Sequence, residues 1–103
     1  MTFILATPSE VQRELGSRLR MQRLNQGLPQ KELGAKAGLS LGAIRKLERD
    51  GSSSLDTLIK VVHALGLITE LDELFRLKAL SIAQMEKNAQ TGQRQRASSR
   101  KKP

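Results

Sequence analysis

Apolar residues recur every three or four positions along much of the chain, a spacing that predicts helices and almost no strand. The first apolar stripe comprises Val11, Leu15 and Leu19, at i, i+4 and i+8. We predict that this helix begins near Pro8, because Thr7 and Glu10 have the spacing of a capping box and proline suits a first helical turn. The turn formers at residues 25–27 are expected to end it.

Two shorter helices are predicted next, with a sharp turn between them. Their apolar residues can face each other: Leu33 and Ala37 on the first helix, Ile44 and Leu47 on the second. Gly38 is expected to end the first helix in a left-handed conformation, and Ser40 to cap the second. The outer face of the second helix is left to Leu41, Gly42, Arg45, Lys46 and Arg49. This pattern is typical of a helix-turn-helix, here over about residues 29–49, whose second helix meets the DNA major groove.

A fourth helix is predicted after the turn-rich segment 50–54. Either Ser53 or Ser54 can cap it, and Gly66 is expected to close it. Its predicted apolar stripe consists of Leu55, Leu58, Ile59, Val62 and Leu65.

A fifth helix is predicted over residues 69–88, starting at Thr69 with Asp72 at the capping-box position. Its apolar residues cover more than one face, so we expect it to pack on the core and also to form a dimer interface. The interface is predicted to include Leu71, Leu74 and Phe75.

The net charge of the 103-residue chain is +8, and most of it lies at the C-terminal end. Residues 87–103 hold six basic residues and no acid, which leaves a net charge of +2 for the rest. A body so nearly balanced must place its basic residues on one side in order to bind DNA. Residues 89–103 read as a disordered tail, which either binds DNA without sequence preference or is an inert, solubilising extension.

The composition also limits the kinds of catalytic and metal sites that the chain can form. The chain has no cysteine, no phosphate-cradling glycine loop and no cluster of carboxylates. Its one histidine, His63, borders an apolar stripe and is interpreted as a packing or surface residue. We therefore expect no catalytic site, no metal and no cofactor. The lack of cysteine and of any long apolar run is typical of a cytoplasmic protein that does not enter a membrane.

From about Leu15 to Leu67 the sequence resembles the lambda-repressor-like helix-turn-helix family, also called Cro/C1-type or XRE regulators. The resemblance rests on four segments together: residues 28–33 (LPQKEL), 38–40 (GLS), 44–48 (IRKLE) and 54–58 (SLDTL). It implies an all-α DNA-binding bundle of about five helices. The predicted organisation is an N-terminal arm (1–7), this domain (8–88) and the basic tail (89–103).

The resemblance also implies roles for individual residues. Ser40, Leu41, Gly42 and Lys46 match DNA-facing positions, Arg45 and Arg49 share the exposed face, and Gln30 matches a phosphate contact. Arg23 and Glu48 match a structural ion pair. Leu41 and Gly42 depart from the family pattern, in which polar base readers such as glutamine are common there. Pro29 also departs from it, because relatives often have a capping threonine at this position.

Two functions follow from this interpretation. The first is a transcriptional repressor that binds a palindromic, double-stranded DNA operator as a homodimer. The alternative is an antitoxin of the HipB-like kind, which binds a partner toxin and represses their shared operon. Phe3, Ile4 and Leu5, together with the apolar excess of the helix at 69–88, can offer a docking surface for a toxin. The same three residues can instead pack on a neighbouring subunit, as a short strand paired across a dimer.

Overall fold

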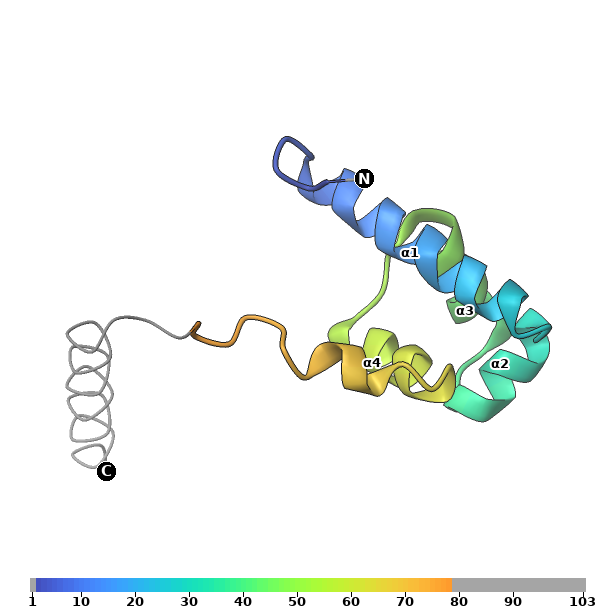
Figure 1. Cartoon of the computed structure of the whole chain (residues 1–103). Coiled ribbons are helices and arrows are strands. Elements are labelled where there is room, and N and C mark those ends of the chain that lie inside the picture. Colours follow the sequence, from blue (N-terminus) through green and yellow to red (C-terminus); the bar gives the residue numbers. More distant parts are fainter. Residues whose placement is uncertain (1, 79–103) are drawn as a thin grey trace, which may run out of the picture. The chain divides into compact units, whose positions relative to one another are not determined.

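The computed structural model of the chain describes residues 2–78 (Figure 1). Its elements, in chain order, are α1 (Pro8–Asn25), α2 (Gln30–Ala37), α3 (Leu41–Asp50), α4 (Leu55–Ala64) and a short 3₁₀ helix, η1 (Ile68–Leu71). No strand occurs within these residues, and the predicted all-α class is confirmed. All five elements belong to one unit of the chain, Met1–Asp72, and a second unit begins at Glu73.

Three of the four α-helices begin at a hydroxyl side chain that caps them. The Thr7 hydroxyl accepts a hydrogen bond from Glu10 N–H, and the Glu10 carboxylate accepts one from Thr7 N–H, so the predicted capping box is present. Ser40 accepts from Ala43 N–H, and Ser54 accepts from Thr57 N–H. The exception is α2, whose N-cap is Pro29 and makes no side-chain hydrogen bond. Its first backbone amides therefore have neither an intrahelical partner nor a side-chain cap.

The core lies where the four helices meet. It consists of Leu19, Leu28, Leu33, Ile44, Leu47, Val61, Val62 and Leu65. α1 packs mainly on α3, and α2 packs on both α3 and α4. Ile44 is fully buried and Leu47 nearly so, as the predicted inner face of the second motif helix requires.

The predicted apolar stripe of α4 was wrong at two positions. Leu55 is 71% exposed and Ile59 is 41% exposed, whereas Val61, which the prediction omitted, is buried. The reason is that a different side of the helix faces the core from the one predicted. The residues toward the core are Leu58, Val61, Val62 and Leu65, at i, i+3, i+4 and i+7. Leu55 and Ile59 form a separate i, i+4 pair at the edge of this stripe.

The predicted fifth helix was wrong over the part that the structure describes. Residues Ile68–Leu71 form a 3₁₀ turn, in which Glu70 N–H donates to the Leu67 carbonyl, and no α-helix follows up to residue 78. Leu67 and Leu71 both pack against the core, and this contact holds the chain in a tight turn. Phe75 has a φ of 59°, a left-handed value that interrupts a helix. Residues 79–88 of the predicted helix, and the tail 89–103, lie outside the described residues.

Two glycines allow α1 to lie directly on the end of α3. Gly51 follows α3 with a φ of 74°, and a Cβ atom there would overlap the carbonyl oxygen of Gln12 in α1. A Cβ atom on Gly16 would overlap the carbonyl oxygen of Leu47 and lie 3.1 Å from the Gly51 Cα atom. The two backbones are therefore closer than any side chain permits.

The segment before α1 forms a turn, not the predicted strand. Ala6 N–H donates to the Phe3 carbonyl, which closes the turn, and the Arg18 guanidinium lies 4.9 Å from the centre of the Phe3 ring. Ile4 and Leu5 occupy the two central positions of the turn and are almost completely exposed.

Candidate nucleic-acid interface

The turn between α2 and α3 brings the two helices into close contact. Gly38 ends α2 with a φ of 69°, in the left-handed conformation predicted for it. Leu39 N–H then donates to the Gly34 carbonyl at 2.8 Å. A Cβ atom on Gly34 would lie only 2.8 Å from the Leu39 carbonyl oxygen and 3.6 Å from Ile44 Cγ1. Gly34 thus lets α2 approach α3, because it has no side chain.

The outer face of α3 is basic and apolar. Arg45 and Lys46 are exposed, and the Arg49 side chain is 72% exposed. Leu41 is half-buried, and Gly42 is exposed with open space around it. Neither Arg45 nor Lys46 forms a salt bridge with an acid of residues 2–78. Their charges therefore face solvent on the side of α3 opposite the core.

A buried ion pair joins α1 to α3 below this face. Arg23 donates to Glu48 through two nitrogens, Nε to Oε2 at 2.7 Å and Nη2 to Oε1 at 3.0 Å. The third guanidinium nitrogen donates to the Leu28 carbonyl at 2.8 Å. Both side chains are less than a tenth exposed. Because every charged group in the pair is hydrogen-bonded, the pair fixes the position of α3 relative to α1.

Gln30, the first residue of α2, also belongs to this network. Its Nε2 donates to Glu48 Oε1 at 3.0 Å, and the residue is half-buried. The second N–H of this amide remains for another acceptor. Sequence reasoning missed this bond, because no spacing rule connects residues 18 positions apart in different helices.

The loop after α3 is ordered by Asp50. Its Oδ1 accepts from Ser52 N–H at 2.8 Å, and its Oδ2 lies 3.4 Å from Arg49 Nη2. The hydrogen bond from Ser52, with the positive charges of Arg49 and Lys46, lowers the pKa of the Asp50 carboxyl against a smaller opposing effect of burial. The Ser52 amide is therefore not free for a phosphate. Sequence reasoning missed this role, although an aspartate two residues before a serine is a known turn signal.

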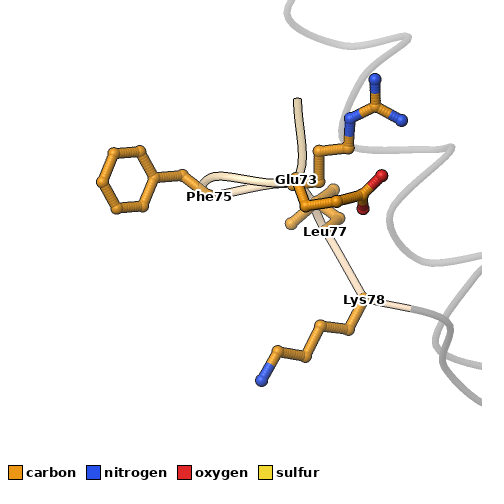
Figure 2. A pocket seen from close by; sticks show the side chains of 5 residues that line it. Glu73, Phe75, Leu77 and Lys78 are labelled. Carbon is orange, nitrogen blue, oxygen red and sulfur yellow. The ribbon is translucent and has the colours of Figure 1, made fainter. Parts of the chain in front are cut away.

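The residues predicted to form a dimer interface do not share one environment. Leu71 is half-buried and packs against the core of its own chain. Leu74 is half exposed and Phe75 is 95% exposed. Figure 2 shows the open hollow next to them, lined by Glu73, Phe75, Arg76, Leu77 and Lys78, with the Phe75 ring pointing away from the Glu73 carboxylate. The lining residues therefore offer scattered charges and exposed apolar groups, not a convergent set of catalytic groups.

No group of three histidine, aspartate or glutamate side chains within residues 2–78 is placed to hold a metal ion. His63 is exposed on α4. Over the same residues, no helix combines the length and apolar character that crossing a bilayer requires.

Residues 19–74, more than half of the chain, match the helix-turn-helix family. The match includes α2, the turn at Gly38 and α3. The chain belongs to this family of Cro/C1-type regulators and is a DNA-binding transcriptional regulator. A search of curated proteins found no match. Residues 8–18 of α1 and the turn before it lie outside the family match.

Proposed function

We propose that this protein is a repressor that binds a palindromic operator as a two-fold dimer. The observation that supports this best is the outer face of α3, where Arg45, Lys46 and Arg49 are exposed on the side away from the core. A recognition helix needs such a face, because cationic donors can reach both phosphates and the acceptor groups of guanine. A protein that covers a promoter can repress transcription by excluding polymerase.

The proposed contacts with DNA are of two chemical kinds, contacts with bases and contacts with phosphates. Lys46 and Arg45 are proposed to read bases in the major groove, and Arg49 to bind a phosphate. Gln30 is proposed to bind a phosphate through the amide N–H that Glu48 leaves unused, beside the uncapped amides of α2. Ser40, at the start of α3, is proposed to donate a hydrogen bond to the DNA through its hydroxyl group. The charged contacts set the affinity and its salt dependence, and the base contacts set the sequence.

The proposed dimer forms through apolar residues at the end of the described chain. Leu74 and Phe75 are the exposed members, and Leu71 contributes less, because it packs on its own core. A two-fold dimer places two α3 helices on successive turns of one face of DNA, and this geometry calls for a palindromic site.

The test is a titration of the full chain against its own promoter DNA, with a scrambled duplex as competitor, at near-physiological salt. We expect binding that survives the competitor, with two chains per site. A Leu74→Ala/Phe75→Ala variant should still fold but bind with lower affinity and reduced cooperativity. One chain per site at saturation would contradict the dimer, and equal affinity for the scrambled duplex would contradict sequence-specific regulation.

A second candidate function is that of an antitoxin, which binds a toxin as well as the shared operator. The observation that favours it is the turn before α1, where Ile4 and Leu5 are 88% and 93% exposed. Large apolar residues at such a position are typical of a surface that another protein covers. Co-expression with the neighbouring gene product tests this. We expect an Ile4→Ser/Leu5→Ser variant to release the partner and keep operator binding, and a partner retained by this variant would argue against the turn.

A further inference from the structure

The outer face of α3 carries the cationic donors Arg45, Lys46 and Arg49, whereas each acidic side chain of this helix already accepts hydrogen bonds within the protein. Two acids lie on this helix, and both are already engaged. The Glu48 carboxylate is buried and accepts from Arg23 and Gln30. The Asp50 carboxylate accepts from Ser52 N–H and lies beside Arg49.

The first turn of α3 is apolar. Leu41 begins the helix and is half-buried, so that part of its side chain remains exposed. Gly42 beside it adds no side chain, and a Cβ atom there would meet only the Ser40 hydroxyl oxygen, at 3.9 Å. The Ser40 oxygen in turn accepts from Ala43 N–H. The end of the helix that approaches the groove most closely can therefore offer a base mainly the methyl groups of Leu41.

These two features restrict which bases α3 can read. In the major groove, guanine offers the acceptors O6 and N7, and thymine offers a 5-methyl group. The amino groups of adenine and cytosine are donors and require an acceptor on the protein. Building on the proposed operator binding, we infer that α3 reads thymine methyl groups through Leu41 and guanine acceptor edges through Arg45 and Lys46. It makes no hydrogen bond to the amino group of adenine or cytosine.

The experiment begins with selection of preferred sequences from a random duplex library by the full chain. In the selected duplex, each thymine is then replaced singly by deoxyuridine, which lacks only the methyl group. Each guanine is replaced by 7-deazaguanine, which lacks the N7 acceptor. We expect deoxyuridine at one thymine per half-site to weaken binding about fourfold, the worth of one buried methyl group. At least one guanine per half-site should be sensitive to 7-deazaguanine.

Two variants assign the effect to α3. Leu41→Ala should bind the thymine and deoxyuridine duplexes equally, while Leu55→Ala, the same change at the first residue of α4, should keep the difference. Far-ultraviolet circular dichroism and a urea titration establish that both variants are folded. Gly42→Gln supplies the missing acceptor in open space, and a selection with this variant should gain a preference for adenine at one position.

The inference is overturned if the wild-type chain selects a sequence but no deoxyuridine weakens binding. It is also overturned if Leu41→Ala, shown to be folded, keeps the deoxyuridine effect. Loss of binding when the N6 amino group of an adenine opposite α3 is removed would show an acceptor on this face. A library from which no sequence emerges would instead overturn the proposed function. Failure of the proposed function and failure of the base-reading inference therefore give different results.

Discussion

The network of Arg23, Glu48 and Gln30 shows what single residues contribute to the interface. The Arg23–Glu48 pair was expected from the family resemblance, and the structure adds the third member and the Leu28 carbonyl. An ion pair buried this deeply costs desolvation, which its hydrogen bonds offset. The pair links α1 to α3, the helix that we propose to read bases. That role makes the pair sensitive to removal of either partner.

We expect Glu48→Gln to lower the free energy of unfolding by about 3 kcal/mol or more, because it leaves the Arg23 guanidinium buried without a counter-charge. Urea titration measures this change. The control is Glu14→Gln, which removes the acid from an exposed i, i+4 pair with Arg18 and should cost less than about 1 kcal/mol. Equal costs for the two variants would contradict the structural role of the buried pair.

Asp50 gives the stability of the fold a pH dependence of defined sign. Its pKa is lowered in the folded chain by the Ser52 N–H bond, so the carboxylate stabilises the fold at pH values above its ordinary, unfolded-state pKa. This stability disappears as the pH falls through the folded pKa. Wild type should therefore unfold at higher urea concentration than Asp50→Asn at pH 7. The difference between their urea midpoints should shrink below about pH 4, and a difference that stays constant down to pH 3 would contradict this assignment.

Among the elements, local signals determined most of what could be predicted from the sequence. The caps at Thr7 and Ser40 and the left-handed Gly38 depend on neighbouring residues and occur as predicted, and Ser54 is one of the two caps expected for α4. The apolar stripe of α4 and the segment after it depended on tertiary contacts. Leu55 and Val61 both fit a helical spacing with Leu58, and Ile59 fits one with Val62, so packing on the core decides which of them is buried. The packing of Leu71 on the core does not follow from spacing either. The basic outer face of α3 was visible in the sequence, because its periodicity is strong.

The contact between α1 and the end of α3 can be tested at Gly51. Alanine at Gly51 must adopt a left-handed φ and also overlaps the Gln12 carbonyl. Gly66 has a φ of 75° with nothing nearby, so Gly66→Ala carries the backbone cost alone, roughly 1–2 kcal/mol. We expect Gly51→Ala to be clearly less stable than Gly66→Ala in urea and to bind DNA more weakly, because α3 shifts. Similar stability for the two variants would mean that the backbone contact has little effect.

At the scale of the whole molecule, we expect the basic residues near the C-terminal end to raise the affinity for any DNA, and the residues of α3 to determine which sequence is bound. The sequence outside residues 87–103 has a net charge of only +2, so we expect the exposed cations of α3, Arg45, Lys46 and Arg49, to act on DNA through their position and not through the net charge. Residues 89–103 carry five basic residues and no acid. Such a segment can add phosphate contacts to any DNA sequence, and each contact steepens the salt dependence of binding by releasing counterions.

We therefore expect deletion of residues 89–103 to weaken binding to specific and scrambled duplexes by the same factor. The slope of log K against log salt should become shallower by about 0.9 for each phosphate that the shortened chain no longer neutralises. A chain of full length with the five basic residues of this segment changed to glutamine is the matched control, because it removes charge and keeps length. It should behave like the deletion if charge is the cause. A salt slope unchanged in both variants would mean that the C-terminal segment does not bind DNA, and that the phosphate contacts all come from the helical domain.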